Sequence, residues 1–179
     1  MLRLVAWCPL VLVVTAVAAS AQALPMTPEA KIQNALSAAP AYIAQGAAVW
    51  DWPAEGQTQA PVLRGGSNGW TCLPTHPEDL ANAPMCMDEA MREFRVALWR
   101  GEEPTLDRIA VRYMLQGGPG VDSQGRQTLG PHIMISIPAG LGLADWIADA
   151  QRPNGPFVSS EINGTVITIP VAAAGGSTR

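Results

Sequence analysis

His132 and Met134 are the residues whose types and spacing most favour chemistry. They stand two positions apart in GPHIMISIP (130–138), and alternate residues of an extended strand point to the same face. An imidazole and a thioether on one face form a ligand pair that suits Cu(I). Met114 and Arg112 have the same spacing in an earlier stretch and are expected on the same side. These four side chains are the candidate ligand face, and a soft-metal (copper) protein using His132 and Met134 is one hypothesis.

The same histidine permits two other interpretations. A strand histidine is most often a core residue satisfied by a backbone or side-chain partner, and this is the interpretation we favour. Alternatively, His132 acts with a nearby hydroxyl or carboxylate, as in a hydrolase. The sequence lacks the nucleophile elbow, the zinc-protease motif, the phosphate loop and the dinucleotide fingerprint, so we predict no catalytic residue. The other histidine, His76, lies in a polar loop and is expected to be solvated.

Tryptophan is the most abundant aromatic residue, with six copies against two each of Phe and Tyr. Trp50, Trp52 and Trp70 flank the first predicted strands, where a tryptophan cluster can line a groove for a sugar or a peptide. The same residues can instead supply core volume in a chain with few other aromatic side chains. We favour the core role.

Cys72 and Cys86 are predicted to form a disulfide. The bond would join a strand end to the start of a helix across a proline-rich loop, and closing a loop of this size removes roughly 3 kcal/mol of unfolded-chain freedom. Two buried free thiols are the alternative. The third cysteine, Cys8, falls within the predicted leader and would be removed with it.

Residues 1–21 are typical of a secretory signal peptide. A single cation, Arg3, precedes an apolar run over 4–17, and small residues suit cleavage after Ala21 or Ala23. The run is shorter than the ~20 residues that span a bilayer, so no membrane span is expected after cleavage, although an uncleaved anchor is an alternative. We therefore expect a secreted or periplasmic protein, a compartment in which disulfides persist.

The charge balance is mildly acidic, with 11 Lys plus Arg against 15 Asp plus Glu. Nucleic acids and anionic lipids require a basic surface, and the sequence has no basic run. We therefore expect no nucleic-acid partner.

The elements that would position these residues form a single α+β domain over 27–171. Helical spacing and capping residues predict helices over 27–39, 88–100 and 141–150, with a helical turn over 42–46. Alternation and turn signals predict strands over 47–50, 62–64, 70–73, 108–116, 132–137, 157–162 and 165–171. We expect an antiparallel sheet of about four to six strands, with helices packed on it and a disordered tail over 172–179. The isoleucines of 132–137 should share a core face with Ile109, Val111, Tyr113 and Leu115.

Four segments together resemble a family of uncharacterised small exported bacterial proteins. They are NGWTC (68–72), PMCMD (84–88), YMLQGG (113–118) and GPHIM (130–134). The resemblance covers about 31–171 and implies no activity, cofactor or site residue. The sequence as a whole predicts an exported, non-catalytic binding or accessory module without a cofactor.

Overall fold

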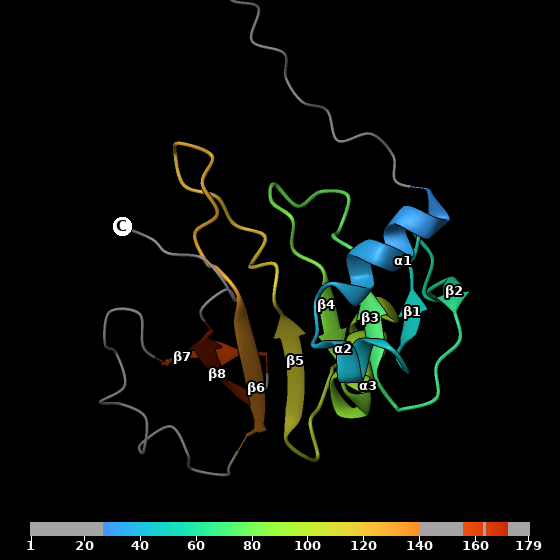
Figure 1. Cartoon of the computed structure of the whole chain (residues 1–179). Helices are drawn as coiled ribbons and strands as arrows, with labels where there is room; N and C mark the ends of the chain where they lie inside the picture. Colours follow the sequence, from blue (N-terminus) through green and yellow to red (C-terminus); the bar gives the residue numbers. More distant parts are fainter. Residues whose placement is uncertain (1–26, 140–155, 163, 172–179) are drawn as a thin grey trace, which may run out of the picture.

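The computed structural model describes residues 27–139, 156–162 and 164–171 (Figure 1). In this part of the chain, eight strands form one sheet and three helices pack against it. Across the sheet the strands follow the order β2 (Val62–Arg64), β1 (Ala48–Trp50), β3 (Thr71–Leu73), β4 (Met85–Met87), β5 (Ala110–Met114), β6 (His132–Pro138), β8 (Gly164–Pro170) and β7 (Phe157–Glu161).

The first two helices both begin at a proline, and the first also has a capping side chain. Helix α1 (Pro28–Leu36) has Thr27 as its N-cap, whose hydroxyl accepts from the Ala30 amide at 3.2 Å. Pro40 then ends this segment and precedes the short α2 (Ala41–Ala44). Both starts agree with the sequence prediction.

Helix α3 (Glu89–Trp99) is fixed to the sheet by its N-cap. One oxygen of Asp88 accepts from the Met91 amide at 2.9 Å, which caps the helix. The other oxygen accepts from the Val111 amide of β5 at 2.7 Å. A single carboxylate therefore joins the helix start to a central strand, and the predicted helix is confirmed.

The sheet differs from the prediction in strand number and in strand direction. It has eight strands rather than four to six, and β4, which was not predicted, lies at its centre between β3 and β5. Its sequence, Met-Cys-Met, is apolar at every position because the strand is buried on both faces. The sheet is mixed rather than antiparallel, since β1 pairs with β3 in parallel.

Two cores lie on opposite faces of the first half of the sheet. Helix α3 covers one of them, and α1 and α2 cover the other (Figure 1). The α3 side includes Leu73, Met85, Met87, Met91, Phe94 and Met114. The α1 side includes Ala35, Ile43, Val49, Cys72 and Cys86. Adjacent residues of β3 and β4 thus enter different cores, as the alternation of side chains along a strand requires.

Cys72 and Cys86 form the predicted disulfide, but in a different setting. They are direct partners in the antiparallel pair β3–β4, with 4.0 Å between their Cα atoms. Cys86 belongs to β4 and not to the start of the helix, so the bond joins two neighbouring strands. Both cysteines are fully buried beneath α1.

The predicted core face of β5 and β6 is wrong in part. Val111 and Tyr113 do pair with Ile135 and Ile133. However, the buried residues of β5 are Ala110, Arg112 and Met114 on the opposite, α3 side, and Ile109 is 50% exposed. Figure 1 shows why: α1 and α2 lie over β1, β3 and β4, and no described helix lies over β5 or β6 on that side.

Three predictions lie outside the described residues. These are the leader over 1–21, the helix over 141–150 and the tail over 172–179. Among the described residues, every helix is too short or too polar to cross a membrane.

Candidate functional site

The four residues of the candidate ligand face do come together. In the β5–β6 register, Met114 is opposite His132 and Arg112 is opposite Met134. Three of the four side chains are closed to solvent, because His132 is 1% exposed, Met114 is 5% exposed and Arg112 is 7% exposed, whereas Met134 is half-buried. A ligand therefore has no direct access to His132.

His132 is held as a neutral core residue. Its Nδ1 lies 2.8 Å from the Gly130 carbonyl oxygen, which can only accept, so Nδ1 carries the proton. Burial lowers the pKa of His132 below its ordinary value. The hydrogen bond to Gly130 opposes this shift, and the nearby positive charge of Arg112 adds to it. Among the described residues, no hydroxyl or carboxylate forms a hydrogen bond with its ring.

The Arg112 guanidinium lies against two methionine sulfurs, one from this face and one from α3. Arg112 Nε lies 3.1 Å from Met134 Sδ, and Arg112 Nη1 lies 3.9 Å from Met91 Sδ. A guanidinium at this position opposes a second cation by charge repulsion, which weakens the copper hypothesis. In addition, no three His, Cys, Asp or Glu side chains of the described segments gather closely enough to hold a metal ion.

The tryptophans do not form one cluster. Trp50 and Trp52 pack against the core on the α3 side, whereas Trp70 packs against the α1 side, with its ring 5.5 Å from that of Tyr113. Trp99 of α3, which the sequence analysis passed over, meets Trp52 edge-on at 6.1 Å. All four are half-buried, so the favoured core role agrees with their packing.

His76 is less exposed than predicted. Its ring stands edge-on to Trp52 with 4.6 Å between the ring centroids, and the residue is half-buried. Trp52 in turn donates to the Pro74 carbonyl at 2.7 Å. These contacts fix the loop after β3 against the end of β1.

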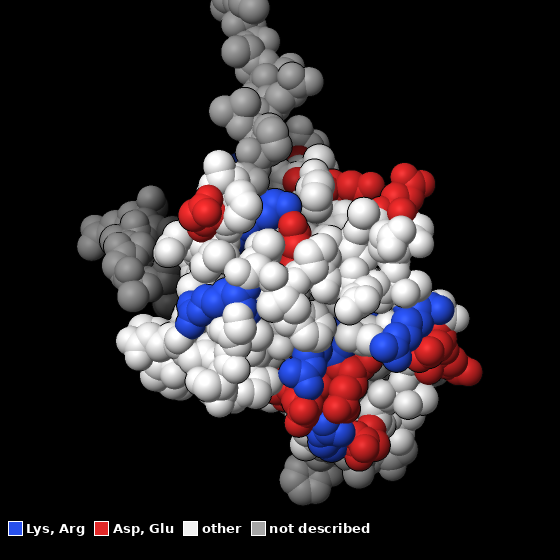
Figure 2. All heavy atoms as spheres, turned by 90° about the vertical axis from the view of Figure 1, so that its right-hand side faces the viewer, with Lys and Arg blue, Asp and Glu red and all other residues white. Residues whose placement is uncertain are grey.

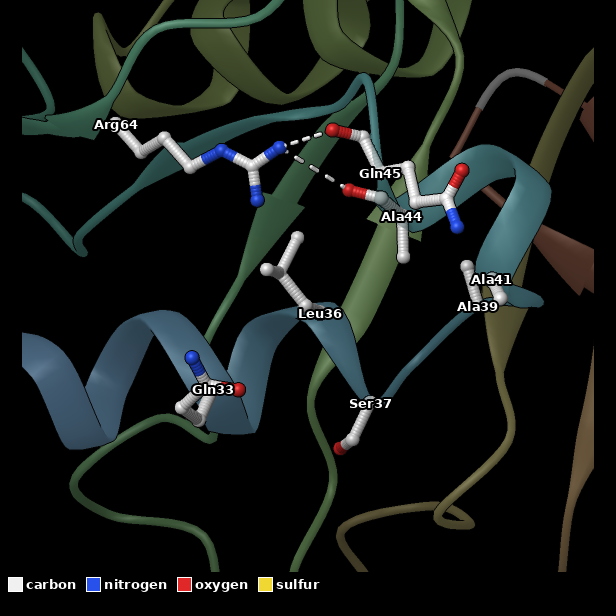
Figure 3. Close-up of a pocket in the computed structure, with 8 residues that line it drawn as sticks. All are labelled: Gln33, Leu36, Ser37, Ala39, Ala41, Ala44, Gln45 and Arg64. Atoms are coloured by element: carbon white, nitrogen blue, oxygen red, sulfur yellow. Dashed lines mark hydrogen bonds between the residues drawn. The ribbon is translucent and has the colours of Figure 1, made fainter.

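An open hollow of about 560 Å³ lies on the α1 side of the sheet (Figure 3). We call it the Arg64 hollow. Its lining residues are Gln33, Leu36, Ser37, Ala39, Ala41, Ala44, Gln45 and Arg64. The floor is built from small or aliphatic side chains of α1, α2 and the turn between them, and one arginine from β2 overhangs it. A volume of this size is within the range of small-molecule sites.

Arg64 is held in place by the end of α2. Its Nη2 donates to the carbonyls of Gln45 and of Ala44, the latter at 3.4 Å. These carbonyls are left over where a helix ends, and a cation satisfies them well. Figure 3 shows the other terminal nitrogen of Arg64 turned into the hollow, towards Leu36.

The loop after β2 contacts α2 and the turn that follows it. Asn68 donates to the Ile43 carbonyl at 2.7 Å, and the Ser67 amide donates to the Gly46 carbonyl at 2.8 Å. Gly66 passes so close to β1 that a Cβ there would lie 2.1 Å from the Ala48 nitrogen. The turn after α2 is therefore tied to the same chain segment that carries Arg64.

A smaller hollow of about 370 Å³ lies on the α3 side. Its lining residues are Trp50, Thr58, Gln59, Ala60, Val62, Val96, Trp99 and Arg100. The side chains of Thr58, Gln59 and Arg100 are exposed, and none has a fixed position through a hydrogen bond or ion pair in the described part of the chain. This hollow is therefore less well organised than the Arg64 hollow.

The surface around the β2 end of the sheet carries charges of both signs. Figure 2 looks onto this end and shows positive and negative side chains interspersed with uncharged surface. Lys31 and Asp51, for example, pair at 2.5 Å. A mixed surface of this kind offers no footprint for a polyanion.

Sequence reasoning missed the Arg64 hollow and named the buried face instead. The sequence contains only a weak signal for this hollow, because Arg64 ends a short predicted strand before two glycines. Nothing in the sequence places α2 beside Arg64. No model of a known protein family matches the chain, and comparison with curated proteins and with solved structures found no match either.

Proposed function

We propose that this protein is an exported, non-catalytic binding module, secreted or periplasmic, that takes a small organic ligand in the Arg64 hollow. The observation that carries the proposal is the held guanidinium of Arg64 above an open, largely apolar floor. Binding sites typically combine such a floor with a few oriented polar groups. A held side chain also loses little freedom when a ligand binds.

The export part of the proposal draws support from the disulfide. Cys72 and Cys86 are buried direct partners in neighbouring strands. A structural disulfide of this kind persists in an oxidising compartment and is rare in the cytosol. The signal-like residues 1–21 agree with that compartment.

Copper binding and hydrolysis through His132 are supported less well. Both need His132 to be reached by a metal ion or a substrate, and it is 1% exposed. Copper would also have to displace or tolerate Arg112 beside the Met134 sulfur. For these reasons we place the binding function at the open hollow.

The proposal is tested with residues 22–179, produced in an oxidising compartment, against a library of small acids, amines, alcohols and sugars. Ligand-detected NMR should find at least one class that binds, and Arg64→Gln should weaken it. A library in which no class binds would show that the hollow is not a small-molecule site.

A further inference from the structure

We infer that the ligand of the Arg64 hollow carries a carboxylate at one end of a compact aliphatic body. This inference rests on the proposed function, because it names the chemistry of the ligand at the same site. The chemistry is shared by two sources, a free aliphatic acid and the C-terminus of a peptide.

Arg64 has hydrogen-bond donors that can serve a ligand. A guanidinium has five N–H donors, and the two contacts to the Ala44 and Gln45 carbonyls both use Nη2. The donors on Nε and Nη1 have no protein partner among the described residues. One of these nitrogens, as Figure 3 shows, is directed into the hollow.

The positive charge of Arg64 has no carboxylate beside it in the lining of the hollow. No Asp or Glu lines the hollow, and no described carboxylate forms an ion pair with Arg64. Helix α1 carries two ionisable side chains, of which Lys31 is paired with Asp51 and the exposed Glu29 does not line the hollow. The hollow thus holds a fixed positive charge without a counter-ion, which favours an anionic group over a neutral or cationic one.

The floor of the hollow indicates the chemistry of the remainder of the ligand. The floor opposite Arg64 consists of Leu36, Ala39, Ala41 and Ala44, with no aromatic ring. Ser37 offers little to a ligand, because its hydroxyl donates to the Asn34 carbonyl at 2.6 Å and turns away from the hollow (Figure 3). The aliphatic side chains therefore complement methyl and methylene groups, and the amides of Gln33 and Gln45 lie beside them in the lining.

Isothermal titration calorimetry on the mature chain tests the carboxylate directly. The probes are hexanoate and its neutral counterpart hexanol. A second pair, N-acetylalanylleucine and its C-terminal amide, distinguishes a peptide terminus from a free acid. We expect the acid of at least one pair to bind at least about tenfold more tightly than its neutral partner, as a charge-assisted hydrogen bond would provide.

Two variants assign the effect to the hollow. Arg64→Gln removes the charge, and Gln33→Glu places a competing carboxylate in the lining while leaving the α2 carbonyls and Arg64 intact. Both should weaken binding of the acid at least about tenfold. The matched controls are Gln57→Glu, the same charge change on an exposed loop outside the hollow, and Arg100→Gln at the other hollow. Neither should change the affinity by more than about twofold.

Equal affinity for acid and neutral partner, or unchanged affinity in Gln33→Glu, would overturn the carboxylate inference and leave the binding function standing. If neither these probes nor any member of the small-molecule library binds, the proposed function itself fails. The two failures are therefore distinguishable.

Discussion

Arg64 and Arg112 show how position decides the role of a residue type. Arg112 is 7% exposed and its guanidinium lies against the sulfurs of Met134 and Met91, so it serves the interior of the sheet. Arg64 lies at the edge, bonds two helix-end carbonyls with one nitrogen and keeps donors for a ligand. The sequence predicts Arg112, Met114 and His132 on one side of two neighbouring strands, and the β5–β6 register places Met114 opposite His132. The sequence does not reveal that His132, Met114 and Arg112 are buried.

His132 should make folding stability depend on pH. Burial lowers the pKa of His132 in the folded state, whereas the unfolded chain has the ordinary value of about 6.5. Just below that pH the unfolded state binds a proton more readily than the folded state does. The contribution of His132 to the unfolding free energy is therefore fully present above about pH 6.5 and is lost as the pH falls from there through the lowered pKa of the folded state.

Urea unfolding at pH 7.5 and at pH 5.5 measures this effect. The loss of unfolding free energy between the two values should be smaller in His132→Leu than in the wild type. His76→Gln, which removes the other histidine and leaves His132 in place, measures separately any share of the loss that comes from His76. An identical loss in wild type and His132→Leu would contradict the assignment.

At the scale of elements, the predictions succeed where local signals are strong. Thr27–Pro28 and Asp88 each begin a helix as expected, because capping depends on residues within one turn. Strand β4 was missed because Met85, Cys86 and Met87 are all apolar and precede a helix with a methionine stripe. A three-residue strand that is buried on both faces lacks the alternation of polar and apolar residues that predicts a strand. Its identity depends on β3 and β5, which are distant in sequence.

Gly66 should be essential for the arrangement of β1, β2 and α2. A Cβ at Gly66 would meet the Ala48 backbone nitrogen at 2.1 Å, and backbone cannot move aside as a flexible side chain can. Gly66→Ala should therefore lower the unfolding free energy by at least about 2 kcal/mol, as overpacking does. Urea unfolding measures this change.

The adjacent glycine provides the control. Gly65 has no atom within 4 Å of the position that a Cβ would take, and Gly65→Ala should change stability by less than about 0.5 kcal/mol. Similar effects of the two substitutions would show that the close approach to β1 is not a constraint.

At the scale of the whole molecule, the α+β class and the Cys72–Cys86 bond were predictable, whereas the location of the open site was not. The class follows from local periodicity, and the pairing follows from having two cysteines outside the predicted leader. The Arg64 hollow instead requires α1, α2 and β2 to meet on one face of the sheet. The order of strands that creates this meeting includes the parallel pair β1–β3, which no local pattern encodes.

His132 is buried in the sheet, whereas the Arg64 hollow is open, and the central claim is that a ligand binds at the hollow. The most direct test is a ¹H–¹⁵N NMR titration of the oxidised chain over 22–179 with whichever acid binds in calorimetry, hexanoate or N-acetylalanylleucine. We expect the largest amide shift changes at Gln33, Gln45 and Arg64, with His132 and Met114 unaffected. Changes centred on His132 and Met114, with the hollow unmoved, would contradict the account.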